Sequence, residues 1–547
     1  MKRNLSFSLE NGSPSEKFDD DGRALRTGTV MTASAHIITA VIGSGVLSLA
    51  WAIAQLGWIA GPIALVIFSL ITWFTAVLLA DCYRHPITGR RNHTYMDVGG
   101  LAWRSGLRTW KSAPFQVPGG IKIQLCGLAQ YTNLFGTSIG YTITTAISMA
   151  AIKRSNCFHK YGHTAGCHTS NNLFMVIFAV TEIILSQIPN FNELSMLSII
   201  AAVMSFTYSS IGLGLAIAKL AGRAHVKTSL TGIPVGDGVS SSQKIWNCFQ
   251  ALGNIAFAYS YSLVLVEIQA SYSIFIRKSM LCQHKLFVQW RMSEHLSWRE
   301  FPWCSKIVYW LFSKHLGTRT SGPTFCESKP DTLKSSPPEN TVMKKATLIG
   351  ISVSTVFYML CGVVGYAAFG NGAPGNFLTG FGFYEPFWLV DFANVCIVVH
   401  LVGAYQVYSQ PIFGFVECWC RKRWPGSGFI AREYPIPIPF IGTFSLNFFR
   451  LVLRTAYVIL TTLIATIFPF FNDFLGLLGA ACFWPLTVYF PVEMYISQAR
   501  IRKFSLTWTW MQLLSLLCFI VSLLAAAGSI QGLIRSVQAF KPFQCKL

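Results

Sequence analysis

The feature that most constrains the fold of this chain is a series of apolar runs about 20 residues long, the length an α-helix needs to cross the hydrocarbon core of a bilayer. The runs lie near residues 29–55, 58–80, 123–152, 173–189, 194–218, 245–268, 346–369, 385–411, 447–468, 472–496 and 507–532. Only 12% of the 547 residues are charged, about half the share in an ordinary soluble protein. The sequence therefore predicts an all-α polytopic membrane protein with about eleven transmembrane helices.

Basic residues give this predicted bundle an orientation. The formal net charge is +21, but the lysines and arginines lie between apolar runs, where they mark cytoplasmic loops rather than a nucleic-acid-binding surface. Most of the 43 basic residues fall inside if the N-terminus is cytoplasmic. We therefore expect a cytoplasmic tail over residues 1–28, a transmembrane domain over 29–535 and an extracellular tail over 536–547.

The first apolar run, within Thr27–Pro62, contains Gly43, Ser44 and Gly45 at its middle. Each glycine in a helix interior costs about 1 kcal/mol relative to alanine, and a break releases backbone groups that hydrocarbon cannot satisfy. We predict that the helix breaks here and that the break lines a binding site halfway through the membrane. Close packing of another helix against a face of small residues would give the same pattern.

The loop after the third run carries Cys157 and Cys167, ten residues apart on the predicted outside. Extracellular cysteines at such a spacing favour a loop disulfide. His159, His163 and His168 lie between and beside them. A zinc site is the alternative, although the spacing differs from that of zinc fingers.

Residues 270–330 differ from the rest of the chain. They contain four tryptophans and many basic side chains, with no apolar run of bilayer length and no sustained helical or strand period. An amphipathic segment on an anionic leaflet would have such a composition.

Several long segments, in order, make the chain resemble the plant amino acid permeases, proton-coupled members of the amino acid and auxin permease family. They are Thr27–Pro62, QLCGLAQYTNLFGTSIGYTITTAISM over 124–149, the loop KRSNCFHK, FAYSYSLVLVEIQ over 257–269, DTLKSSPPENTVMKKATLIG over 331–350, and GYAAFGN over 365–371. In that family Gln269 would run directly into Asp331. The resemblance therefore identifies residues 270–330 as an insertion, from a retained intron or a gene-model error.

The resemblance also implies a fold and a substrate site. The fold is the 5+5 inverted repeat of the sodium-coupled leucine transporter in the amino acid-polyamine-organocation superfamily, with one extra C-terminal helix and with spans one and six broken. The substrate-binding candidates are Gly43, Ser44 and Gly45 as a backbone cradle for a carboxylate, Phe257, Tyr259 and Ser260 on span six, and Tyr131 as a lid. The aromatic residues among them are also typical of ordinary packing or interface anchors.

Proton coupling needs a titratable group inside the bundle. His36 lies two helical turns before Gly43 on the same face, and histidine exchanges protons near neutral pH. Asp391 on span eight is the second candidate. A neutral histidine that joins two helices, or an aspartate that caps a helix end, would explain the same residues structurally.

The sequence thus predicts a non-enzymatic symporter that imports neutral amino acids, and in some cases charged ones, across the plasma membrane by alternating access. Protons are the coupling ion, membrane lipid surrounds the protein, and no other cofactor, metal or nucleic acid is expected. An auxin carrier or another carrier of small amphoteric solutes is the alternative within the family. A channel, a receptor, or a product made inactive by residues 270–330 are the alternatives outside it.

Overall fold

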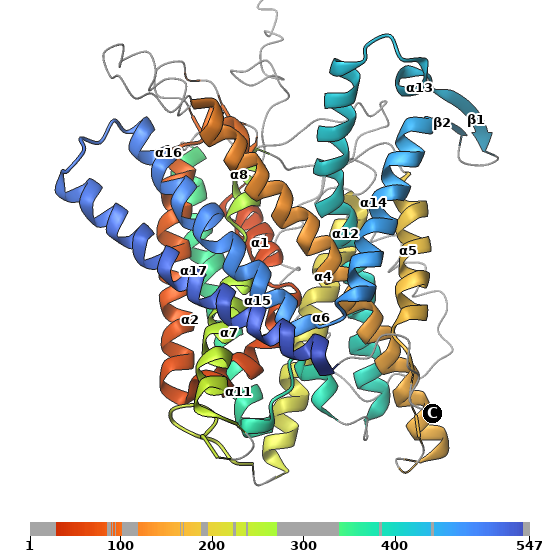
Figure 1. Cartoon of the computed structure of the whole chain (residues 1–547), viewed down its shortest axis with the longest axis vertical. Coiled ribbons are helices and arrows are strands. Elements are labelled where there is room, and N and C mark those ends of the chain that lie inside the picture. Colours follow the sequence, from red (N-terminus) through yellow and green to blue (C-terminus); the bar gives the residue numbers. More distant parts are fainter. Residues whose placement is uncertain are drawn as a thin grey trace, which may run out of the picture.

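The computed structural model describes residues 29–84, 89, 91–92, 94–100, 119–162, 164, 166–167, 169–187, 195–222, 226–236, 239–270, 339–381, 386–438 and 442–539. The predicted N-terminal tail, nearly all of the 270–330 insertion, and the C-terminal tail beyond residue 539 lie outside the described residues. Figure 1 shows helices packed side by side along most of the long axis of the molecule.

Nine helical stretches in the described part are long and apolar enough to cross a membrane, and two further apolar helices, α1 (Val30–Val41) and α5 (Asn172–Ser186), are shorter. One of the nine, 44–81, has 38 residues and would be about 57 Å long as a single helix, nearly twice the hydrocarbon thickness. It is divided at Gly57, whose φ of 83° interrupts α2 (Leu49–Asp81). The part before Gly57 completes span one with α1, and the part after it is span two, so the described residues form eleven spans.

The other spans follow in chain order. They are α4 (Gly119–Tyr161), α5, α6 (Ser195–Ala221), α7 (Ser241–Ala258) with α8 (Ser262–Ala270), α11 (Glu339–Phe369), α12 (Phe387–Arg423), α14 (Phe448–Ile467), α15 (Phe471–Cys482) continued by a π-helix (Phe483–Tyr489) and α16 (Phe490–Gln498), and α17 (Leu506–Ala539). The all-α, eleven-span prediction is confirmed. Several helices extend past their predicted ends because hydropathy marks only the apolar part of a helix.

Each of several spans packs on the span that comes five later in chain order. α2 packs on α11, α4 on α12 and α5 on α14, while the 3₁₀ helix η2 (Ser44–Ser48) of span one packs on α7 of span six. Two repeats related by an axis in the membrane plane would give such pairs. The predicted 5+5 repeat is confirmed, and the eleventh span, α17, packs on α7 and α15 outside it.

The break in span one lies where the sequence predicts it. α1 ends at Val41, Ile42 and Gly43 are extended, and η2 then leads into α2. A Cβ on Gly45 would lie 2.9 Å from the Cα of Ala258 at the end of α7, closer than real Cβ atoms approach. Both interpretations of the glycines therefore hold, because the segment is a helix break and also a close contact between two helices.

The break in span six has no glycine or proline. α7 ends at Ala258 and α8 begins at Ser262. The hydroxyl of Tyr358 on α11 lies within hydrogen-bond reach of two carbonyl oxygens, that of Ala258 at 3.2 Å and that of Val41 at the end of α1. One side chain of span seven therefore serves a freed carbonyl at each break.

A loop over residues 226–236 interlocks with the turn between spans one and two. A Cβ on Gly57 would lie 2.2 Å from the backbone nitrogen of Gly232, and one on Gly232 would lie 1.9 Å from the carbonyl oxygen of Gln55. The backbone N–H of Asn371, just after α11, donates a 2.8 Å hydrogen bond to the carbonyl oxygen of Lys227 in the same loop. Only glycine fits where the two turns touch.

Two smaller features lie at opposite ends of the bundle. The predicted disulfide is present and joins Cys157 in the last turns of α4 to Cys167 in the loop that follows, and the ring of His159 stacks on Phe387. His163 and His168, the other members of the alternative zinc site, lie outside the described residues. At the other end, the antiparallel strands β1 (Tyr434–Ile438) and β2 (Gly442–Leu446) project from the bundle beside the short helix α13 (Gly428–Ala431) (Figure 1).

Candidate functional site

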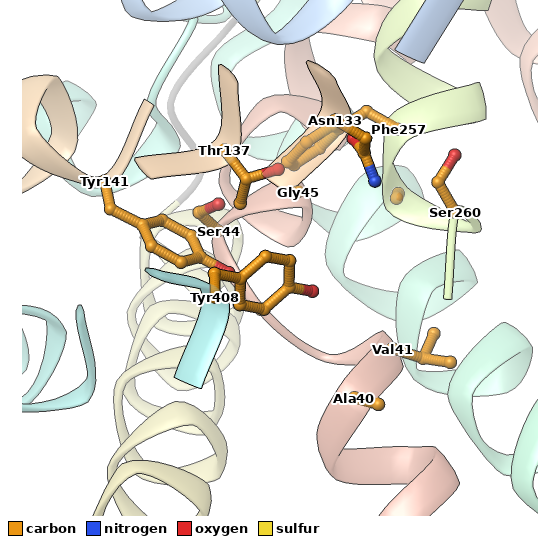
Figure 2. A pocket seen from close by; sticks show the side chains of 12 residues that line it. Ala40, Val41, Ser44, Gly45, Asn133, Thr137, Tyr141, Phe257, Ser260 and Tyr408 are labelled. Atoms are coloured by element: carbon orange, nitrogen blue, oxygen red, sulfur yellow. The ribbon is translucent and has the colours of Figure 1, made fainter. Parts of the chain in front are cut away.

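A small cavity of about 40 Å³ lies between the two helix breaks. It is lined by residues of spans one, three, six and eight: Ala40, Val41, Gly43, Ser44, Gly45, Asn133, Thr137, Tyr141, Phe257, Ala258, Ser260 and Tyr408. Figure 2 shows the side chains of Ser44, Thr137 and Tyr408 around the same space. None of the twelve lining residues is charged, so a ligand here meets hydroxyl groups, one amide and backbone dipoles.

Five of the seven residues predicted to bind substrate line this cavity. Gly43, Ser44 and Gly45 form one wall, and Phe257 and Ser260 come from the opposite break.

The two other predicted residues lie outside it. The hydroxyl of Tyr259 is 3.2 Å from that of Thr355, and its ring packs edge-on against Tyr358. The ring of Tyr131 lies 4.5 Å from that of Phe415. Residue 131 precedes Asn133 by two residues, which rotates it about 200° around α4, away from the lining face. Tyr131 therefore lies outside the cavity lining in this structure, and its role as a lid stays a prediction.

Sequence reasoning missed the face of α4 that closes the cavity. Asn133, Thr137 and Tyr141 follow one another at intervals of four, which places them on one side of a helix. That stripe of polar side chains within an apolar run was a readable signal. Tyr408 of α12 meets this stripe with its ring edge-on to Tyr141 at 5.4 Å between centroids. It could not have been found from spacing, because the contact joins residues far apart in the chain.

The two breaks present backbone groups of opposite polarity to the cavity. Ser44 and Gly45 stand in the first turn of the helical segment that leads into α2, where N–H groups lack intrahelical acceptors and favour an anion. Val41 and Ala258 stand at the ends of α1 and α7, where carbonyl oxygens favour a cation. A zwitterion with a carboxylate and an ammonium group matches this arrangement without any charged side chain.

The cavity is small in this structure. A volume of about 40 Å³ holds about three water molecules. An organic ligand therefore needs side chains such as Phe257 and Tyr408 to move before it can enter.

The predicted proton-handling residues lie at different distances from the site. His36 is half-buried on α1, one turn before the lining residue Ala40. Asp391 lies away from the breaks, near the start of α12, where one carboxylate oxygen accepts a hydrogen bond of 3.1 Å from the side-chain amide of Asn156 on α4.

A second histidine approaches the break more closely. His400 on α12 is 5% exposed, and its Nδ1 lies 2.7 Å from the carbonyl oxygen of Ala201. A carbonyl only accepts, so Nδ1 carries hydrogen and Nε2 is the free acceptor of the neutral ring. This Nε2 lies 4.0 Å from the position of a Cβ on Gly43. Sequence reasoning had selected the histidine near the break in the chain and missed the one near it in space.

A bundle in which two discontinuous helices meet at a polar cavity near mid-span is the architecture of secondary transporters. Residues 26–273 and 330–535 match the family described as transmembrane amino acid transporter protein, and the chain belongs to this family. The unmatched residues between these two segments fall within the predicted insertion.

Individual relatives match nearly end to end. The chain is 59% identical to amino acid permease 6 of Arabidopsis thaliana, covering 98% of this chain and 96% of that protein. It is 54% identical to amino acid permease 1 of the same plant, covering 97% and 94%. The predicted kinship with plant amino acid permeases is confirmed. Among solved structures, the nucleobase-cation-symport-1 family transporter Mhp1, closed with bromovinylhydantoin bound, aligns over 97% of both chains with 13% identity and a TM-score of 0.47.

Proposed function

We propose that this protein is a proton-coupled symporter that imports amino acids across the plasma membrane by alternating access. The observation that carries the proposal is the cavity between the two helix breaks, with N–H groups of Ser44 and Gly45 on one side and the carbonyl ends of α1 and α7 on the other. This polarity fits the carboxylate and the ammonium group that all free amino acids share. The Arabidopsis relatives are named amino acid permeases, which supports the same substrate class.

Proton coupling would use the histidines beside the first break. The free Nε2 of His400 is close to Gly43, and His36 stands one turn from the cavity, so a proton on either ring would change the field at the carboxylate position. One positive charge that crosses 100 mV contributes about 2.3 kcal/mol, or about 50-fold accumulation. One proton per amino acid therefore suffices to drive uptake.

The test is an electrical assay in oocytes. The full chain and a form without residues 270–330 are exposed to a panel of amino acids and to auxin at external pH 5.5 and 7.5. We expect inward current with amino acids that is larger at the lower pH. If neither form responds to any amino acid while both reach the surface, the proposal fails. A response to auxin alone would make the protein the alternative carrier.

Counterflow separates a carrier from a channel. Proteoliposomes loaded with unlabelled amino acid should accumulate labelled amino acid transiently without any ion gradient, because a carrier exchanges one molecule for another. Uptake that only equilibrates would contradict alternating access.

A further inference from the structure

A second cavity, of about 240 Å³, lies further along α4 toward the end that carries the disulfide. Its α4 lining is Ile147, Ala150, Ala151 and Arg154, and Asn171 before α5 and Thr379 of η5 (Phe377–Phe381) complete it. It is several times larger than the central cavity and begins six residues beyond Tyr141, about 9 Å along the helix. On the predicted topology this cavity faces the outside.

Arg154 is the charged member of this lining. Its side chain is exposed, and it forms no ion pair in the part of the chain that the structure describes. Asp391 on the neighbouring helix α12 accepts a hydrogen bond from Asn156, which lies about 200° around α4 from Arg154. An arginine beside polar Asn171 and Thr379 suits a carboxylate, which it can bind with two parallel hydrogen bonds.

The geometry points to an outer subsite: we propose that this second cavity binds the carboxylate of an amino acid before that molecule enters the central cavity. The inference rests on the proposed function, since it names where the same substrate is first captured. The apolar floor of Ile147, Ala150 and Ala151 would accept the side chain of a neutral amino acid. Arg154 lies about 20 Å along α4 from Tyr141 and about 140° around it, so a bound molecule has to pass around this helix to reach the central cavity.

Transport kinetics of the full chain provide the first test. Arg154→Gln should raise KM for L-alanine about 3-fold, as expected for a partly exposed charge interaction, and leave the maximal current unchanged. Lys153→Gln is the matched control. It also removes one positive charge, but Lys153, the neighbour of Arg154, is an exposed residue outside the cavity lining. Equal effects of the two variants would reduce the role of Arg154 to general surface charge and overturn the proposal.

Protection of an introduced thiol tests binding without transport. In Thr379→Cys, an impermeant cationic thiol reagent added from outside should react more slowly with saturating L-alanine, and the protection should be lost when Arg154→Gln is added. L-Alaninamide, which lacks the carboxylate, should not protect.

Protection should also persist in a variant whose central site is distorted, such as Gly45→Ala, whose Cβ would press on Ala258 at the second break. If protection disappears there, the thiol reports the central site and the proposal fails. If sodium chloride protects as well as alanine, the cavity is a general anion site and the proposal also fails. If the wild-type protein carries no amino acid current while Thr379→Cys shows alanine protection, the transport proposal is rejected and the outer subsite is retained.

Discussion

The two helix breaks reach similar geometry by different means. In span one, Gly43 and Gly45 weaken the helix locally, because glycine disfavours a helix interior, and Gly45 in addition admits the close approach of Ala258, whose Cα would lie 2.9 Å from a Cβ at position 45. In span six, Tyr259 and Ser260 are not helix breakers, and contacts from other spans hold the open backbone. A break caused by its own residues should persist when contacts from other spans are removed. A break held by such contacts should close or change shape without them.

The largest effect is expected from a substitution at the break in span one. Gly45→Ala should reduce uptake about 10- to 100-fold, because its Cβ would press on the backbone of α7 and overpacking costs about 1–3 kcal/mol. Gly214→Ala on α6 is the matched control, since nothing lies within 4 Å of its Cβ and it is outside the cavity lining. Uptake rates normalised to surface protein give the result. Equal losses in both variants would contradict the close-contact role of Gly45.

A change in Tyr358 tests the link between the two breaks. Tyr358→Phe removes the hydroxyl that serves both Val41 and Ala258, and a buried carbonyl without a donor costs about 1–3 kcal/mol. We expect about 10-fold lower uptake and a lower midpoint of thermal unfolding in detergent. Tyr161→Phe, at an exposed position, should leave both unchanged. A wild-type unfolding midpoint in Tyr358→Phe would show that the second break holds without this contact.

The second break should also respond to a smaller local change. The hydroxyl of Ser260 donates a 2.7 Å hydrogen bond to the carbonyl oxygen of Ala256 and lines the cavity. Ser260→Ala should raise KM about 3-fold, since one hydrogen bond contributes about 1 kcal/mol. Ser242→Ala, at an exposed position at the start of α7, is the control. A KM within experimental error of the wild type would remove Ser260 from the site.

The smallest effect is expected at Tyr131. Because its ring packs on Phe415 outside the cavity, Tyr131→Phe should change KM less than about 2-fold. The current measured as a function of amino acid concentration gives this KM. A large rise in KM would instead support the lid predicted from the sequence and would mean that α4 turns during transport.

The sequence predicted the features that depend on residues close together in the chain. Apolar runs gave the eleven spans, and the Gly43–Gly45 triplet gave the first break. The second break was implied only by the family resemblance, without a local signal in its residues, and the role of Tyr358 was not predicted, because both depend on contacts between residues about a hundred positions apart. The same limit explains why His36 was selected and His400 was not: proximity in the chain is visible in a sequence, whereas proximity between α12 and span one is not.

The interlocked glycines at positions 57 and 232 have a mechanical consequence. Neither turn can slide past the other, because each backbone already occupies the space of the other's missing side chain. The loop over 226–236 also holds the end of α11 through Asn371. At this end of the bundle, spans one, two and seven therefore act as a single rigid clamp. In the proposed transport cycle we therefore expect the chain to bend at the two breaks, where α1 and α8 begin to separate from this end of the bundle.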